Sequence, residues 1–220
     1  MPDCGSTSDH VELFATYGDL AMHYFHEPLI QALNFMDKHL KFLDYNMVGL
    51  SGGGWTSTTV PAIEPRIHIS IAVAGSMPGV EFVPGAGNSW NHGDCNSPCY
   101  AEQNTPDYYT LAGYLDQYIM ASYGKHRHHI QILNQNDSCC YGAPQWTNPL
   151  FDFQAYYGVD WTTYLASYNS SIRAALVGIQ PAEYTLMIDT TATEHQFSPA
   201  AISYIISTLN AEHPLRQKGR

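Results

Sequence analysis

Short runs of apolar residues alternate along the chain with longer segments in which apolar side chains recur every three or four positions. The short runs have the composition of buried strands, and they cover 45–50, 67–74, 129–134 and 184–189. The longer segments between them have the helical period. Strands that alternate with helices in this way predict a parallel sheet with right-handed crossovers. We therefore expect an α/β fold in which a small, mostly parallel sheet is flanked by helices.

The expected helices are placed by their periodicity and by the Pro, Gly and capping residues at their ends. The first lies within 10–40, and Pro28 marks either its start or a kink inside it. The others are expected at about 53–63, from Thr105-Pro106-Asp107 onward, near 169–177 before Gly178, and from Ser198-Pro199 onward. The side chains expected to share one face of the third helix are Leu111, Leu115, Tyr118 and Ser122. Residues 76–104 are rich in Gly, Pro, Asn and Ser and predict a long irregular segment.

A chain of 220 residues is long enough for one domain with a sizeable core. The patterns divide it into a helical N-terminal segment at 1–42, a core that carries the chemistry at 43–212, and a tail at 213–220. No apolar run reaches the roughly 18 residues that a membrane-spanning helix needs. Charged residues make up only 13% of the chain and Tyr occurs 16 times, a composition that favours a secreted or extracytoplasmic protein.

The net charge and the cysteines bear on whether the chain binds nucleic acid, forms disulfides or holds a metal ion. A net charge of −11 argues against nucleic acid, because a polyanion is bound through a basic patch. Cys95 and Cys99 lie in the irregular segment and form either a short disulfide clip or two free thiols. The other cysteines are Cys4, Cys139 and Cys140, of which the adjacent two cannot bond each other without strain. No Cys or His partners occur at zinc-site spacing, so no metal is expected.

The segment GLSGG at 49–53 indicates a specific chemistry. It fits the pattern G-x-S-x-G, and it follows an expected strand and precedes an expected helix. In that context Ser51 lies on a sharp turn that lifts its hydroxyl above the sheet, where it can act as a nucleophile. The N–H of Gly52 would then face the oxyanion that develops during attack. The alternative is an ordinary glycine-rich loop between a strand and a helix.

A serine nucleophile needs a base and an orienting carboxylate, and both should follow strand ends at the same edge of the sheet. His195, between the fourth strand and the last helix, is the expected base. Asp137, shortly after the third strand, is the expected acid, and Asp189 at the end of the fourth strand is the alternative. The competing histidines lie at the opposite end of a strand or in the irregular segment, and they are His92, His126, His128 and His129.

Five segments, taken in chain order, carry a family resemblance. They are GLSGGGW at 49–55, EPRI at 64–67, AGSMP at 74–78, NQNDSCC at 134–140 and HQFSPAAI at 195–202. Together they resemble the α/β-hydrolase superfamily, in a bacterial branch whose members are mostly presumed esterases, and the resemblance covers about residues 9–210. It implies an acyl-enzyme mechanism carried by Ser51, Asp137 and His195, and it does not specify the substrate.

The resemblance is incomplete on the N-terminal side. Members of this superfamily usually have further strands before the helix that precedes the nucleophile, and a His-Gly loop among them supplies a second oxyanion donor. Only about forty residues precede the strand at 45–50 here, so the resemblance implies a truncated fold that lacks the N-terminal half-sheet and a lid domain. The strand at 45–50 then becomes an edge, covered either by the N-terminal helix or by a second chain in a homodimer.

The side chains near the expected strand ends suggest a substrate class. The expected substrate contacts are Trp55, Met77 and Trp146. An open cleft lined by aromatic side chains would accept aryl esters, or segments of a polyester such as polyethylene terephthalate. Two other interpretations stay open: a thioesterase or amidase that uses the same groups, and a non-catalytic binding module whose triad is a relic. None of them requires a cofactor.

Overall fold

The computed structural model describes residues 13–14, 16–40, 42, 44–78, 106–138, 141–143 and 152–211. These residues form an α/β structure around a four-stranded parallel sheet with the strand order β1-β2-β3-β4. The strands are β1 (Tyr45–Leu50), β2 (Ile67–Val73), β3 (His128–Asn134) and β4 (Glu183–Asp189). The expected fold class is confirmed, and each expected strand agrees with an observed one to within one residue at either end.

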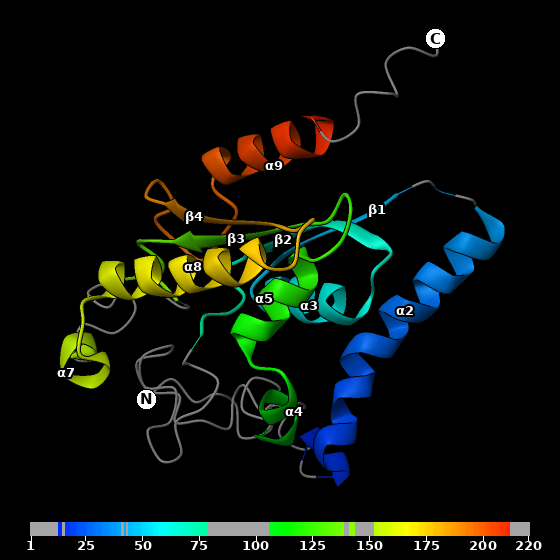
Figure 1. Cartoon of the computed structure of the whole chain (residues 1–220), viewed down its shortest axis with the longest axis horizontal. Helices are drawn as coiled ribbons and strands as arrows, with labels where there is room; N and C mark the ends of the chain where they lie inside the picture. The colour runs from blue at the N-terminus through cyan, green and yellow to red at the C-terminus, as the bar shows by residue number, and fades with distance from the viewer. Residues whose placement is uncertain are drawn as a thin grey trace.

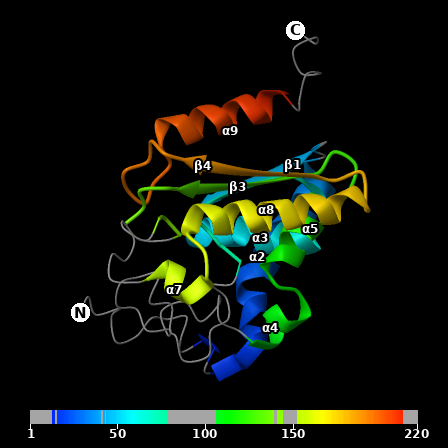
Figure 2. The same cartoon turned by 60° about the vertical axis from the view of Figure 1, so that its left-hand side comes forward.

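Helices cover the two faces of the sheet unequally (Figure 1). One face carries α3 (Gly52–Ile63), α5 (Tyr114–Ser122) and α8 (Trp161–Val177), and of the described helices only α9 (Pro199–Ala211) lies on the other. Figure 2, turned by 60°, shows the same two layers. The remaining described elements are η1 (Gly18–Ala21), α2 (Met22–His39), α4 (Pro106–Leu111) and α7 (Phe153–Tyr157). No helix in the described part of the chain has the length and apolarity to cross a membrane.

Two buried clusters fill the space between the sheet and its helices. The cluster beneath α3, α5 and α8 is rich in aromatic side chains, among them Trp55, Tyr114, Tyr118, Trp161 and Tyr168. The cluster beneath α9 is aliphatic, and its members include Ile69, Ile71, Ile130, Ile132, Ala201 and Ile205. The central strands β2 and β3 are therefore buried on both faces, which explains why they read as continuous apolar runs.

Helix α2 packs beside the edge strand β1, on the face that carries α3. Its Leu33 forms a small buried cluster with Val60 of α3 and Ile67 of β2, and Met47 of β1 packs against this cluster. The helix thus covers one face of the sheet near β1. It does not pair with the strand, and β1 stands at the end of the described sheet. We expected either the N-terminal helix or a second chain to cover this edge, and the helix covers only one face of the sheet beside it.

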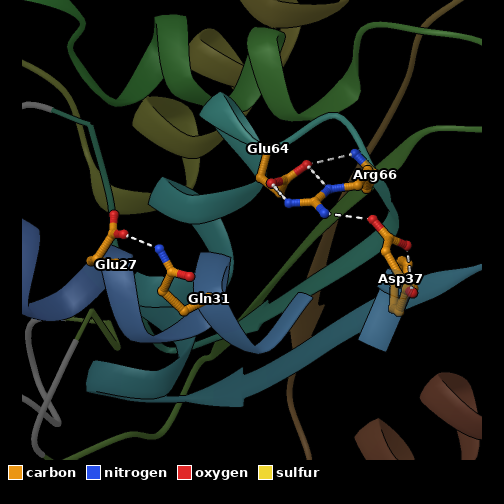
Figure 3. Close-up of polar contacts among 6 residues, drawn as sticks. Glu27, Gln31, Asp37, Glu64 and Arg66 are labelled. Atoms are coloured by element: carbon orange, nitrogen blue, oxygen red, sulfur yellow. Dashed lines mark hydrogen bonds and ion pairs between the residues drawn. The ribbon is translucent and has the colours of Figure 1, made fainter. Parts of the chain in front are cut away.

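A group of charged side chains holds the C-terminal end of α2 (Figure 3). Arg66, in the turn between α3 and β2, contacts Asp37 of α2 and Glu64 at 2.5 Å each. Tyr45 donates a further hydrogen bond to Asp37 at 2.6 Å. This hydrogen bond and the contact with Arg66 hold the pKa of Asp37 below its ordinary value. The group therefore fixes α2 to both β1 and β2.

The expected single helix after Thr105 is wrong, because the chain forms two short helices, α4 and α5. Gly113 interrupts the helical path with an extended backbone, and its N–H donates to the carboxylate of Asp116 at 3.1 Å, which starts α5 anew. The expected common face fails for the same reason. Leu111 is 87% exposed, whereas Tyr118 is fully buried.

Helix α8 begins at Trp161, well before the expected segment at 169–177, and ends before Gly178 as expected. Its N-cap is Asp160, whose carboxylate accepts hydrogen bonds from the N–H and the hydroxyl of Thr163 at 3.0 Å and 2.6 Å. The short helix α7 was not expected at all. The irregular segment expected at 76–104 lies outside the described residues except for its first three positions.

Glycines at the junction of β1, α3 and β2 allow backbone to pack directly on backbone. A Cβ atom on Gly49 would lie 2.1 Å from the carbonyl oxygen of Gly53. A Cβ on Gly75 would lie 2.2 Å from the carbonyl carbon of Gly54, and a Cβ on Gly54 would lie 2.5 Å from the carbonyl oxygen of Val73. Any side chain at these three positions would force the strands and the helix apart.

Replacing Gly75 by Ala should therefore destabilise the fold, whereas Gly53→Ala should not. The added methyl group at position 75 overlaps fixed backbone, at a cost of about 1–3 kcal/mol in the free energy of unfolding. A Cβ at Gly53 meets nothing within 4 Å and lies inside α3, where Ala is favoured over Gly by about 0.5–1 kcal/mol. Urea unfolding of both variants measures the two changes, and equal stabilities would contradict the close packing.

Candidate active site

Ser51 occupies the turn between the end of β1 and the start of α3. Its backbone has φ 59° and ψ −124°, a region that non-glycine residues avoid at a cost of about 1–3 kcal/mol. Two hydrogen bonds hold the turn: the N–H of Ser51 donates to Val73 at 2.9 Å, and the N–H of Trp55 donates to the carbonyl of Ser51 at 2.8 Å. A strained serine between a strand and a helix has the backbone geometry of a nucleophile elbow.

Helix α3 begins at Gly52, directly behind Ser51. The N–H groups in the first turn of a helix have no partner within the helix and carry its partial positive charge. Apart from its chain neighbours and the backbone of its own helix, no atom of the described residues lies within 4 Å of the position that a Gly52 Cβ would take, so these residues leave the space beside the turn open. An anionic oxygen placed there would be stabilised by the helix N-terminus.

Asp137 and His195, which are far apart in the sequence, are joined in the structure. The His195 Nδ1 lies 2.7 Å from the Asp137 Oδ2, so the imidazole donates its Nδ1–H to the carboxylate. Asp137 is fully buried, while the His195 side chain is 21% exposed. This hydrogen bond selects the tautomer that presents Nε2 as a proton acceptor, which is the form that a general base requires.

The loop that carries His195 is held by a residue that the sequence did not single out. Asn134, the last residue of β3, is fully buried and donates its Nδ2 to the carbonyl of Gln196 at 2.9 Å and to the carbonyl of Glu194 at 3.5 Å. The N–H of Gln196 also donates to the carbonyl of Glu194 at 2.9 Å, which closes a three-residue turn over His195. Asn134 is the first residue of the segment at 134–140, but an Asn at a strand end has many uses, so the sequence does not indicate this role.

Asp189 bonds the start of the same loop instead of the imidazole. Its carboxylate accepts hydrogen bonds from the N–H groups of Thr191 and Ala192 and from the hydroxyls of Thr191 and Ser198. Burial raises the pKa of Asp189, but these donors outweigh it, and the pKa lies below the ordinary value for Asp. The geometry therefore gives Asp189 the loop-capping contacts, and gives Asp137 the contact with His195.

The sheet topology places the three expected catalytic residues at the same end of the sheet, beyond the carboxyl ends of the strands. Ser51 follows β1, Asp137 follows β3 and His195 follows β4, and these strands are parallel. In such a sheet the carboxyl ends of the strands meet at the same edge, where binding sites form. The competing His128 and His129 lie at the start of β3, at the opposite edge, and burial lowers the pKa of His129 to about 3.

Two of the three expected substrate contacts lie in the core, and the third lies outside the described residues. Trp55 is 1% exposed, and its indole N–H donates to the hydroxyl of Tyr109 at 2.8 Å, so its ring belongs to the core. Met77 is fully buried as well. Trp146 and all five cysteines lie outside the described residues. Within the described part of the chain no group of His, Cys, Asp and Glu side chains is arranged to hold a metal ion.

The chain matches no known protein family and no curated protein. Similar solved structures include dipeptidyl peptidase 4 from Porphyromonas gingivalis, at 15% identity and a TM-score of 0.36 over 76% of this chain and 18% of that one. They also include the siderophore hydrolase EstB from Aspergillus nidulans, at 13% identity and a TM-score of 0.43 over 90% of this chain and 59% of that one. A third is DcsB in complex with its substrate analogue, at 10% identity and a TM-score of 0.36 over 77% of this chain and 64% of that one.

The chain thus spans less than two thirds of each of these three proteins. All three TM-scores lie below 0.5.

Proposed function

We propose that this chain is a serine hydrolase that cleaves carboxylic esters through an acyl-enzyme. The observation that carries the proposal is the strained Ser51 turn at the same sheet edge as the buried Asp137 and its hydrogen bond to His195. A structural serine has no need of a disfavoured backbone, and strain of this kind is concentrated at functional sites. A buried carboxylate paired with a partly exposed imidazole is the arrangement that activates a hydroxyl.

In the proposed reaction the Ser51 Oγ attacks the ester carbonyl carbon while its proton passes to the His195 Nε2. The negative charge that develops on the carbonyl oxygen is stabilised by the N–H of Gly52 and by the N-terminus of α3. Collapse of this intermediate expels the alcohol, which takes the proton from His195. Water then attacks the acyl carbon while His195 accepts its proton. Collapse of this second intermediate breaks the bond to the Ser51 Oγ, releases the acid and returns the proton from His195 to Ser51. Asp137 keeps the imidazole oriented and stabilises its protonated form throughout.

For the substrate we propose aromatic esters, including polyesters such as polyethylene terephthalate. The support comes from aromatic side chains on α7 and the first turn of α8. The rings of Phe153, Tyr157 and Tyr164 have centroids 4.4–5.6 Å apart. Tyr156, which is 43% exposed, meets the ring of Tyr157 edge to face with the centroids 4.8 Å apart. Figure 1 shows α7 beyond the end of the sheet to which the strands point. Such a surface can bind an aryl group by stacking.

Wild-type protein should hydrolyse para-nitrophenyl butyrate and release soluble aromatic acid from a polyester film, and Ser51→Ala should do neither. Loss of the nucleophile removes covalent catalysis, with an expected fall in kcat of about 10⁶-fold. A serine-directed phosphonate followed by peptide mass spectrometry should label position 51. Equal rates in wild type and Ser51→Ala would favour a binding module with a relic triad. Turnover of short esters without release from the film would remove only the polyester part of the proposal.

Substitution of Asp137 should affect the rate of hydrolysis, whereas substitution of Asp189 should affect the stability of the fold. Asp137→Asn should lower kcat/KM by about 10³–10⁴-fold with little change in stability, because the amide orients the imidazole in the wrong tautomer. Asp189→Asn should instead lower the free energy of unfolding by about 1–3 kcal/mol, because it leaves loop donors without an anionic acceptor. Rates per titrated active site, measured beside urea unfolding, distinguish the two. The reverse pattern would assign the acid to Asp189.

A further inference from the structure

Among the described residues no strand pairs with the outer edge of β1, and the register irregularity of this strand lies at its start, between Tyr45 and Asn46. The strand has six residues, YNMVGL, and contains neither a charged residue nor a proline. Proteins commonly blunt such edges with Lys, Pro or a covering segment, because exposed backbone N–H and C=O groups invite pairing with another strand. Beside this edge Val48 is 40% exposed.

Helix α9 extends this apolar edge on the face opposite α2. It contains no charged residue, and Ala201 and Ile205 face the sheet. Successive residues of a helix are rotated by about 100°, so Ile202, Ile206 and Leu209 fall on one flank next to this buried line. Ile202 is 45% exposed and Ile206 is 55% exposed.

The direction of α9 decides which strand this flank overlooks. Figures 1 and 2 show α9 running antiparallel to the strands. Right-handed crossovers through α3, α5 and α8 place β1 on the left when the sheet is viewed from their face with the strands pointing up, and therefore on the right when it is viewed from the α9 face. From that second viewpoint α9 runs downward. The right-handed rotation of about 100° from Ala201, which faces the sheet, to Ile202 then points to the right, toward β1. Val48, Ile202 and Ile206 therefore border one strip, called here the β1–α9 surface.

We propose that the β1–α9 surface is the place where a second copy of this chain docks, with the two β1 strands paired antiparallel. A two-fold axis perpendicular to the sheet through this pair would give one sheet of eight strands. It would keep both α9 helices on the same face, so that their apolar flanks approach each other across the axis. The surface is thus complementary to itself in backbone hydrogen bonding and in apolar side chains.

The charge of the chain favours this strip over the rest of the surface. A net charge of −11 makes two copies repel each other, and the repulsion is smallest where neither contributes a charge. Neither β1 nor α9 carries a charged residue at neutral pH. A basic partner would gain nothing from a neutral strip, whereas an identical partner avoids its own acidic surface there.

Sedimentation velocity of the full chain over a wide concentration range tests the proposal. Wild type should dimerise, and Val48→Lys should weaken the dimer at least about 100-fold, because the symmetry brings two like charges together. Ile206→Lys should weaken the dimer in the same way, so the test still gives a result if circular dichroism shows that one of the two variants does not fold. Val177→Lys is the matched control, because Val177 lies at the end of α8 and is 76% exposed, and this variant should leave the dimer intact.

Hydrogen exchange adds a second measurement on the same samples. Peptides that cover Tyr45–Leu50 should exchange more slowly at high protein concentration than at low concentration, since pairing between two copies would add hydrogen bonds along the outer edge of β1. A wild-type chain that is monomeric at every concentration would overturn the proposal. So would a dimer that survives both Val48→Lys and Ile206→Lys, because its interface would then lie elsewhere.

The hydrogen bonds of Asn134 carry a second inference, which rests on the proposed role of His195 as the base. We infer that Asn134 is a positioning residue: by donating to the carbonyls on either side of His195, it sets the height of the imidazole above the sheet edge. Displacement of a catalytic group by about 1 Å can cost about 10²-fold in rate. Asn136 offers a matched control, because its side chain donates to the carbonyl of Thr190 at 3.3 Å, outside the His195 turn.

Asn134→Leu keeps the shape of the side chain but loses the donor. When kcat is calculated per active site titrated with the phosphonate, this variant should show a fall of about 10–100-fold at unchanged KM. Asn136→Ala should leave this value within a factor of about three. A merely structural role for Asn134 would lower the number of titratable sites and leave kcat per site unchanged, which would overturn the inference. If Ser51→Ala also leaves the rate unchanged, the proposed function itself fails; if only Asn134→Leu is without effect, the positioning role alone fails.

Discussion

Direct packing of backbone on backbone, where β1, α3 and β2 meet, is the constraint on which the rest of this structure depends. Gly49, Gly54 and Gly75 bring the turn and the two strands within distances that no side chain permits. Ser51, which lies beside this junction, is then held in a disfavoured backbone conformation by its hydrogen bonds with Val73 of β2 and Trp55 of α3. The close packing at the glycine junction offsets the strain at the serine.

The parallel sheet extends this local constraint to residues that are distant in sequence. Because all four strands point the same way, the loops after β1, β3 and β4 meet at one edge. Buried polar side chains then fix the loops: Asn134 bonds the turn around His195, and Asp189 bonds the residues that follow β4. These hydrogen bonds lie within the fold, so the protein's own side chains hold the loop in which Asp137 contacts His195.

The sequence predicted the strands and the final helix well, because buried strands are distinct apolar runs and Ser198-Pro199 is a clear helix start. It failed where a single residue redirected the chain. Gly113 divides the segment after Thr105 into two helices, and Asp160 starts α8 earlier than periodicity indicated. The G-x-S-x-G pattern located the strained turn. Asn134 begins the segment at 134–140, but that segment does not indicate its hydrogen bonds to the His195 turn. Trp55 lies in the core, and sequence cannot distinguish an indole in the core from one at a cleft.

The central claim is that the hydroxyl of Ser51 and the imidazole of His195 work as a pair. A crystal structure of the phosphonate adduct tests it most directly, since the adduct fixes the transition-state oxygen and the nucleophile together. The account expects phosphorus bonded to the Ser51 Oγ, the phosphonyl oxygen facing the N–H of Gly52, and the His195 Nε2 within about 3 Å of the reacting oxygen. An adduct at another residue, or an imidazole too distant for even a bridging water, would contradict it.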